Sequence, residues 1–319
     1  MKTYTVKDNE SNQTLEKYVK KVLSEAPLSF IYKVFRKRDV KLNGKRADMK
    51  ERIKAGDIVE IYVSDDKLED FKKKTPLPNE KIKDLIIYED DNILIVNKPK
   101  GMLVQKDEKN CVSLDQLAIS YFIFNNKNID STFSIAPAHR IDRNTSGIVI
   151  FGKSVEVMQE LLQAFKNHNN VEKHYLALVN GVVDKEGEVK LALFKNEETG
   201  IVRPGRLAEG AKSAWTIYKP IKIYHDYTLL DVQILTGRTH QIRAHLLAID
   251  HPIIGDQKYG DFKANKEFAE LYGLSSQFLH AQKVIFHNMK GKLAYLNEKE
   301  FIAELPLKES ALLSKLQLY

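Results

Sequence analysis

The stretch HRIDRNTSG (139–147) places a histidine, an arginine and an aspartate within four positions. Asp142 could act as a nucleophile or a base, and Arg140, two residues earlier, would project to the same side of an extended segment. The permanent charge of Arg140 could keep Asp142 ionised and could contact a substrate phosphate. An aspartate in a turn more often caps neighbouring N–H groups. This stretch alone therefore leaves a catalytic and a structural interpretation of Asp142 open.

The same stretch continues into GIVIFGKS (147–154), which fits the G-x-x-x-x-G-K-S pattern of a phosphate-binding P-loop. A P-loop needs irregular backbone that points N–H groups at phosphates, whereas the Ile-Val-Ile-Phe run at 148–151 favours an extended strand. We therefore predict a strand, a turn at 152–154 and no NTPase site. A kinase-like interpretation of HRID also fails, because Ile141 separates the arginine from the aspartate and no G-x-G-x-x-G precedes it.

A second polar cluster lies downstream in TGRTHQIRAH (236–245), directly after the apolar run YTLLDVQIL. The apolar spacing of Ile242, Leu246 and Ile249 predicts a helix over the latter part of this segment. His240 and Arg243 are three residues apart, so they would share one face of that helix. The junction between strand and helix is therefore a second place where polar side chains could line a site.

The surrounding pattern predicts mostly antiparallel strands interrupted by a few helices. We expect strands in DLIIYE, NILIVN, SGIVIF, KHYLALVNG, SAWTIYK and YTLLDVQIL, and helices in SLDQLAISYF and after Ser154, a suitable N-cap. This order predicts an α+β domain over residues 81–319, built on a mixed, mostly antiparallel sheet with flanking helices. Residues 65–80 are charged and then carry two prolines, so we expect a linker there.

The N-terminal residues 1–64 form a separate unit in this interpretation, with two short helices followed by two strands. They hold 15 Lys and Arg against 9 Asp and Glu, which is six of the net charge of +7 of the whole chain. Arg36, Lys37 and Arg38 begin the densest basic run. Such a density suits the neutralisation of a phosphate backbone, although charge runs are often only solvated surface.

Composition narrows the class of protein further. The chain has 319 residues, 43% of them hydrophobic, which is ordinary globular composition. A single cysteine, Cys111, excludes an intramolecular disulfide framework and fits a reducing compartment. Because the first residues lack an apolar signal region and no later run is long enough to span a bilayer, we expect a cytoplasmic monomer without membrane contact.

At this point the sequence resembles the RluA family of pseudouridine synthases. HRIDRNTSG is similar to the family's H-R-L-D-x-x-T-S-G motif, and KHYLALVNG to its K-x-Y-x-A-x-V-x-G segment. TGRTHQIRAH with HPIIGDQKYG resembles the third block, and YEDDNILIVNKPKGMLV the opening block. The four blocks occur in order over residues 86–260. One departure is Gln105, where the family pattern leads us to expect a histidine.

The N-terminal unit resembles an S4-like RNA-binding domain. The segments SFIYKVFRKRDVKLNGKRAD and IKAGDIVEIYV are similar to its helix, its V-x-V-N-G turn and its G-D-x-V strand. Together with the catalytic blocks, this module implies the branch of the family that modifies large-subunit ribosomal RNA. RNA is therefore the expected partner, with Arg36, Lys37 and Arg38 among the binding residues.

The resemblance implies isomerisation of uridine to pseudouridine in a flipped-out nucleotide, without cofactor or metal. It makes Asp142 the essential carboxylate, as nucleophile or base, and we expect Arg243 to pair with it. Further roles follow from the matched motifs: Arg140 at the flipped nucleotide and its phosphate, Tyr175 against the uracil, Leu235 at the pocket floor, and His240 and Gln241 as supports of the substrate site. The alternative is a catalytically inactive RNA-binding factor for ribosome assembly. Retention of Asp142, Arg140, Tyr175 and Arg243 together favours the enzyme.

Overall fold

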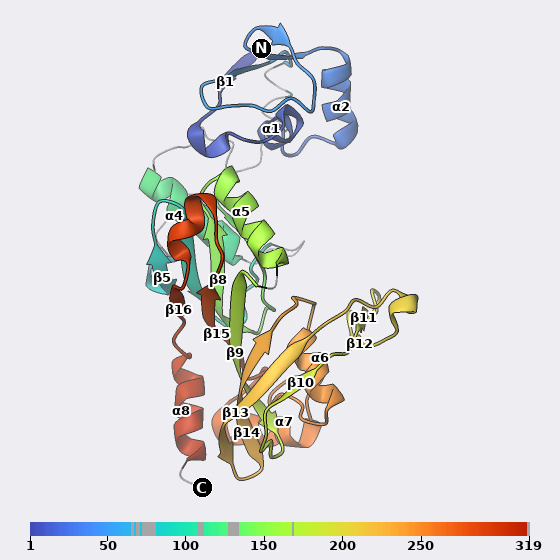
Figure 1. Ribbon diagram of the computed structural model, residues 1–319, viewed down its shortest axis with the longest axis vertical. Helices are drawn as coiled ribbons and strands as arrows, with labels where there is room; N and C mark the ends of the chain where they lie inside the picture. The colour runs from blue at the N-terminus through green and yellow to red at the C-terminus, as the bar shows by residue number, and fades with distance from the viewer. Residues whose placement is uncertain are drawn as a thin grey trace.

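The computed structural model describes residues 1–64, 67, 71, 81–106, 112–126, 134–167 and 169–317. A small N-terminal unit and a larger sheet with helices on both faces make up this part of the chain (Figure 1). Cys111 and nearly all of the expected linker at 65–80 lie outside the described residues. Within the described ranges, no helix has both the length and the apolar character needed to cross a membrane.

The N-terminal unit has its own sheet, in the order β1-β4-β2-β3, and its own apolar core. Its elements are β1 (Lys2–Thr5), the short 3-10 turn η1 (Asp8–Glu10), α1 (Leu15–Val22), α2 (Leu28–Arg36), β2 (Val40–Leu42), β3 (Lys45–Arg46) and β4 (Ile58–Ile61). The two helices and the turn between β2 and β3 are confirmed. The expectation that the helices come first is wrong, because β1 precedes them as an edge strand along β4, and a half-exposed edge strand needs few apolar residues.

Phe71 belongs to the core of this unit although it falls within the expected linker. Its ring centroid lies 4.8 Å from that of Phe30 on α2, and its carbonyl accepts a hydrogen bond from the Glu25 amide at 3.0 Å. The side chain of Gln159 on the larger unit donates to the carbonyl of Asn12 at 3.3 Å, which joins the two units.

The larger unit is built on one sheet in the order β10-β13-β14-β9-β15-β8-β6-β5, with β16 beside β15 and β7 beside β8. Its strands are β5 (Ile86–Glu89), β6 (Ile93–Lys98), β7 (Ala136–Pro137), β8 (Ser146–Gly152), β9 (Val171–Asn180), β10 (Gly187–Val189), β13 (Thr216–Tyr224), β14 (Tyr227–Ile234), β15 (Leu279–Phe286) and β16 (Glu300–Ile302). All the pairings between these strands are antiparallel except that of β8 with β15. The predicted mixed, mostly antiparallel sheet is thus confirmed.

Helices pack on both faces of this sheet, which explains the long apolar runs in β6 and β8. They are α4 (Leu114–Asn126), α5 (Val155–Lys166), α6 (Gln241–Ala248), α7 (Phe262–Tyr272) and α8 (Leu307–Leu316), with 3-10 turns at η2 (Lys83–Leu85), η3 (Leu207–Glu209) and η4 (Gly291–Leu296). Along β8, Ile148 and Ile150 pack on the side of α5, whereas Val149 and Phe151 pack on the side of α4. The predicted N-cap is confirmed, because the Ser154 hydroxyl accepts from the Val157 amide at 3.2 Å.

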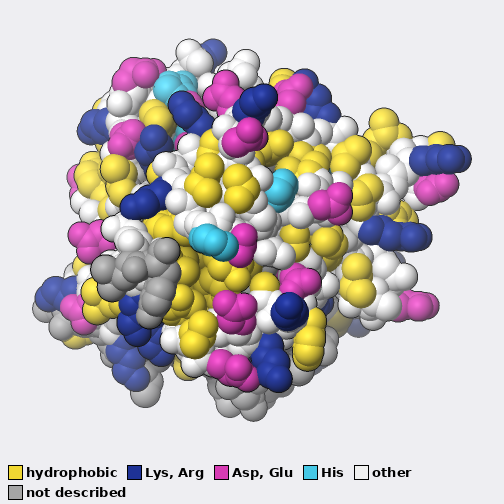
Figure 2. Space-filling model, turned by 90° about the horizontal axis from the view of Figure 1, so that it is seen from below, with side chains coloured by type: hydrophobic (Ala, Val, Ile, Leu, Met, Phe, Trp, Pro, Cys, Tyr) yellow, Lys and Arg dark blue, Asp and Glu magenta, His cyan; other side chains and the backbone are white. Residues whose placement is uncertain are grey.

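A two-stranded arm projects from the sheet (Figure 1). It consists of β11 (Leu193–Lys195) and β12 (Val202–Pro204), which pair antiparallel. Lys195, Arg203 and Arg206 on this arm are exposed, and Figure 2 shows dark-blue Lys and Arg side chains on the projection at the right of the molecule. The arm, β15 and the two C-terminal helices were not predicted from the sequence pattern.

The P-loop-like stretch is a strand, as predicted, and its first glycine has a packing role. Gly147 pairs with Ala281 across the parallel junction of β8 and β15 and adopts a φ of 112°. A Cβ atom there would overlap the carbonyl oxygen of Ala281. At the other end, Lys153 Nζ donates to Asp90 O at 2.6 Å and pairs with Glu89, so this lysine fastens the β5–β6 turn.

We predict that Gly147→Ala lowers the free energy of unfolding by several kcal/mol, about the size of a large core defect. Gly210→Ala is the matched control, because Gly210 has a φ of 85° but open space around its Cα, which leaves only the backbone strain of about 1–2 kcal/mol. Urea unfolding of the two variants measures the difference. Equal losses would contradict a packing role for Gly147.

Candidate active site

The site is a cavity of about 700 Å³ on the face of the sheet that carries α6. The loop before β8, the strand β9 and the TGRTH turn before α6 all contribute to its lining. Asp142 is the only carboxylate among the described residues that line it. The size falls within the usual range for pockets that hold a small molecule or one nucleotide.

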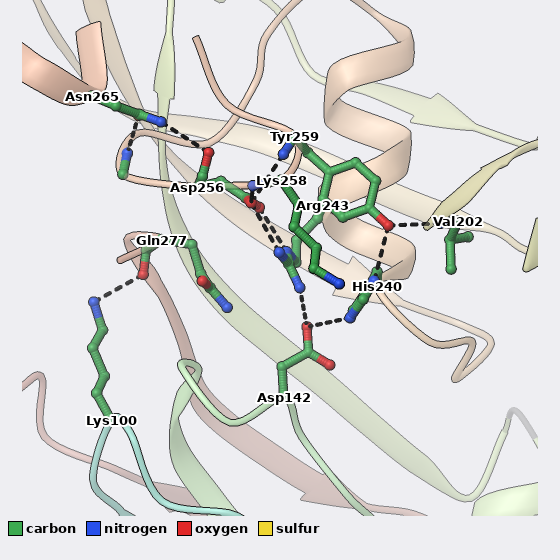
Figure 3. Close-up of polar contacts among 11 residues, drawn as sticks. Lys100, Asp142, Val202, His240, Arg243, Asp256, Lys258, Tyr259, Asn265 and Gln277 are labelled. Carbon is green, nitrogen blue, oxygen red and sulfur yellow. Dashed lines mark hydrogen bonds and ion pairs between the residues drawn. The ribbon is translucent and has the colours of Figure 1, made fainter. Parts of the chain in front are cut away.

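Arg243 joins three segments that are distant in the sequence (Figure 3). Its Nη1 donates to Asp142 Oδ2 at 2.9 Å, while its Nε and Nη2 donate to Asp256 Oδ2 at 2.6 Å and Asp256 Oδ1 at 2.9 Å. The planar guanidinium thus uses one edge for Asp256 and its remaining terminal nitrogen for Asp142. The contact between Arg243 and Asp142 expected from the sequence is present, and it fixes the carboxylate at the cavity wall.

Asp256 is fully buried and its carboxylate is held from several sides. Its Oδ1 also accepts the backbone amides of Lys258 at 2.9 Å and Tyr259 at 3.1 Å. The two carboxylates together raise the pKa of Arg243 above its ordinary value, despite an opposing effect of burial that is the largest single influence. The guanidinium is therefore a permanent cation behind Asp142.

His240 stands beside this ion-pair network at a strained position. Its φ of 51° places it in the left-handed region at the start of α6, and its Nε2 lies 3.9 Å from Asp142 Oδ2. The Tyr259 hydroxyl accepts the Val202 amide at 2.7 Å and lies 2.9 Å from His240 Nδ1, so its own hydrogen is available for Nδ1. Burial lowers the pKa of His240. This arrangement favours a neutral ring with its hydrogen on Nε2, toward Asp142.

A buried lysine fastens the loop that carries Asp142. Lys98 is fully buried, and its Nζ donates to the carbonyls of Pro99, Met102 and Arg143 at 3.0, 2.8 and 3.0 Å. Burial lowers the pKa of Lys98 to about 7, with the nearby charge of Asp142 acting in the opposite direction. Arg143 Nε donates back to Gly101 O at 2.9 Å, so the turn after β6 and the Asp142 loop hold each other.

Strand register places Tyr175 next to the same loop. Ala281 on β15 pairs with Gly147 on one side and with Tyr175 on the other, so these residues form one row across three strands. Tyr175 is buried and lines the cavity. Burial, followed by the charge of Asp142, raises the pKa of Tyr175 well above its ordinary value. Its hydroxyl is therefore protonated at neutral pH.

The other residues singled out from the sequence fall in different places. Arg140 is exposed at the cavity edge. Gln241 is buried, and all four of its hydrogen-bonding positions are used, by Thr236, Arg238, Trp215 and Thr216. It holds the turn that borders the cavity. Gln105 also lines the cavity, at an exposed position.

The placement of Leu235 on the pocket floor is wrong. The residues lining the cavity include Ile234 and Leu279 but not Leu235, because consecutive residues at the end of β14 point to opposite sides. Arg36, Lys37 and Arg38 are exposed on the N-terminal unit and do not contribute to the cavity.

Sequence reasoning missed Asp256, Tyr259 and Lys98. Asp256 and Tyr259 lie in HPIIGDQKYG, a block that was matched as a whole without assigning its polar members. The helix α6 carried a signal for an anionic partner without identifying it, because a buried arginine needs a carboxylate beside it. Within the described ranges, no group of three or more His, Cys, Asp or Glu residues could hold a metal ion.

Comparison with known proteins identifies the family. A family model described as RNA pseudouridylate synthase matches residues 92–248. The chain is 33% identical over 294 residues to ribosomal large subunit pseudouridine synthase C of Vibrio parahaemolyticus, covering 89% of this chain and 87% of that protein. It is 31% identical over 320 residues to an RNA pseudouridine synthase of Mycoplasma capricolum, covering 95% and 97%.

A solved structure has the same fold. Human RNA pseudouridylate synthase domain containing 4 superposes with a TM-score of 0.59 at 22% identity, over 74% of this chain and 94% of that one. The chain therefore belongs to the RNA pseudouridylate synthase family and is an isomerase that acts on uridine in RNA. The resemblance to the RluA family found in the motifs is confirmed.

We predict that Arg243→Lys lowers kcat about 10²-fold, because an ammonium cannot serve both carboxylates in one plane and Asp142 shifts from its position. Initial rates of pseudouridine formation on unmodified ribosomal RNA measure this effect. Arg203→Lys, on the exposed arm, is the control and should keep the wild-type rate. A kcat within twofold of wild type for Arg243→Lys would show that simultaneous binding of both carboxylates by a planar guanidinium is not needed for activity.

Proposed function

We propose that this protein converts specific uridines of large-subunit ribosomal RNA to pseudouridine, with Asp142 as the essential carboxylate. The observation that carries the proposal is the Asp142 carboxylate, the one carboxylate among the described residues that line the cavity, held by Arg243, which Asp256 in turn holds in place. The names of the large-subunit relatives supply the class of RNA.

The cavity position of Asp142 requires the target uridine to leave its stack. A uridine inside folded RNA cannot bring its ribose to a carboxylate at a cavity wall, so base flipping is part of the proposed mechanism. The anion then acts on the sugar, as nucleophile or as base, while the bond to nitrogen 1 breaks. The uracil turns in the cavity, its carbon 5 bonds to the ribose and loses its proton, and nitrogen 1 gains a proton, so the atoms of substrate and product are the same. The reaction consumes no second substrate.

Other side chains around the cavity have supporting roles in this proposal. Arg243 holds the Asp142 carboxylate in place through the hydrogen bond from its Nη1. Tyr175 packs against the uracil. Its hydroxyl is protonated at neutral pH, so it can accept the proton from carbon 5 only if it first gives its own hydrogen to another acceptor. His240 orients the Asp142 carboxylate, and Arg140 contacts the flipped nucleotide and its phosphate.

Residues 1–64 form an S4-like RNA-binding domain in this proposal, followed by a linker at 65–80 and the catalytic domain at 81–319. The basic run at the end of α2 is exposed and makes no ion pair with any described residue. Such cations bind RNA by displacing counterions. We also propose that the protein acts as a monomer.

We predict that Asp142→Asn folds and binds RNA but forms no detectable pseudouridine. Asparagine keeps the size of the side chain and its capping oxygen, so a merely structural aspartate would tolerate the change. Purified variant, checked for a native melting transition, is incubated with unmodified large-subunit ribosomal RNA and assayed for pseudouridine. Asp250→Asn, an exposed turn residue at a φ of 61°, should remain fully active. Substantial turnover by Asp142→Asn would refute the assignment.

We further predict that removing the basic run weakens RNA binding and its salt dependence. The variant carries Arg36→Glu, Lys37→Glu and Arg38→Asn, the last because asparagine tolerates the φ of 64° at that position. The log–log slope of affinity against salt should fall by about 0.7 for each phosphate of single-stranded RNA that the variant no longer neutralises. Reversing three exposed lysines of the catalytic domain, Lys222, Lys266 and Lys308, is the control. An equal slope in both variants would place the binding surface elsewhere.

A further inference from the structure

The cavity has a cationic border in addition to the carboxylate of Asp142. Five basic residues other than Arg243 line it: Arg140, Arg143, Lys166, Lys173 and Arg238. Arg143 and Arg238 each donate to a backbone carbonyl, of Gly101 and Ser213. None of the five makes an ion pair with a residue in the described part of the chain, so their charges are available to an anion.

Lys173 differs from the other four because its side chain is partly enclosed. It is half-buried on β9, and its Nζ lies 5.8 Å from the centroid of the Phe165 ring. The Phe165 ring in turn stacks against His139 at 4.7 Å. His139 is neutral, because burial lowers its pKa to about 3 and the charge of Lys173 contributes in the same direction. The lysine therefore sits among uncharged rings.

An ammonium in such surroundings is poorly stabilised when no anion is near. Burial lowers the pKa of Lys173, and no described carboxylate opposes that effect. An exposed cation without an ion-pair partner is still well stabilised by water. A half-enclosed ammonium has lost part of this solvation, so an incoming anion stabilises it much more. Among the five basic residues of the border, Lys173 has the most to gain from a phosphate.

Strand geometry sets the distance between Lys173 and the reacting nucleotide. Lys173 and Tyr175 are two residues apart on β9, so their side chains share the face that lines the cavity, roughly 7 Å apart along the strand. This separation matches the reach from the base of a nucleotide to a backbone phosphate beside it. Arg140 is likewise two residues before Asp142, just as Lys173 is two residues before Tyr175.

We propose that Lys173 binds a backbone phosphate next to the flipped uridine and thereby holds the nucleotide in the cavity. The assignment rests on the proposed function and adds a second phosphate contact to that of Arg140. Lys173 is a positioning residue here: it makes no bond to the uracil or to the atoms that react.

The test compares Lys173→Met, Lys173→Arg and, as the control, Lys308→Met, an exposed lysine on α8. The probe is in vitro transcribed large-subunit ribosomal RNA, and the readouts are KM, kcat and the salt dependence of binding. We expect Lys173→Met to raise KM roughly tenfold and to reduce the log–log salt slope by about 0.7, with kcat within about threefold of wild type. Lys173→Arg should recover most of the affinity, and Lys308→Met should match wild type.

An unchanged KM and salt slope in Lys173→Met would overturn the proposal, whether or not kcat falls. A selective loss of kcat would assign the lysine to proton transfer or to packing against Phe165 instead. Wild-type protein gives an independent readout, since RNA should protect Lys173 from lysine acetylation as followed by mass spectrometry. Equal labelling with and without RNA would also refute the contact, even if Lys173→Met does not fold.

The binding measurements are repeated in an Asp142→Asn background, where no turnover occurs. A reduced slope there supports the phosphate contact regardless of the chemistry. If wild-type protein formed no pseudouridine in this RNA, the proposed function would fail while the slope would still decide the role of Lys173. The two failures are therefore distinguishable.

Discussion

The arrangement of the site depends on how a single buried guanidinium is neutralised. Arg243 lies on the first turn of α6 and is nearly enclosed, and an unpaired charge there would cost several kcal/mol. Asp256 satisfies one edge of the guanidinium, and Asp142 takes a remaining N–H from the cavity side. Because the fork is planar and rigid, the position of the Asp142 carboxylate is fixed by the same geometry that makes burial of Arg243 tolerable.

The sheet brings Tyr175 next to the loop that carries Asp142. The parallel contact of β8 with β15 is the only departure from antiparallel pairing among the described strands, and it sets Gly147 and Tyr175 on either side of Ala281. A one-residue slip of β15 would turn Ala281 to the other face and move Tyr175 relative to the loop of Asp142. The close backbone approach at Gly147, which excludes any side chain, makes such a slip costly. The register of three strands therefore determines the geometry of the site.

The sequence allowed much of this to be predicted where the information is local. Apolar runs at 93–96 and 148–151 marked buried strands, and the β-branched residues between Gly147 and Gly152 excluded a P-loop before the fold was known. Asp142 and Arg243 could be paired only through the family resemblance, because 101 positions separate them. Asp256 was not predicted as a site residue, because an aspartate after a glycine is typical of a turn. Nothing in the local sequence indicates that its carboxylate is buried. The short edge strand β1 and the orientation of Leu235 likewise depend on tertiary pairing.

Among the described residues that line it, the cavity combines one carboxylate with several basic side chains, and this combination suits a nucleotide better than a free base or a protein segment. Asp142 is paired with Arg243 and lines the cavity. In the proposed reaction, positive charge develops on the ribose as its glycosidic bond breaks, and a carboxylate held at this place would stabilise that charge. The basic residues of the border line the same cavity from other elements, among them Arg140 on the loop before β8 and Lys166 at the end of α5. A nucleotide carries its negative charge only on the phosphates, away from the base. In the proposed complex the phosphates lie at the basic residues and the ribose at the carboxylate, which places the neutral uracil against Tyr175 and Ile234 of the cavity lining.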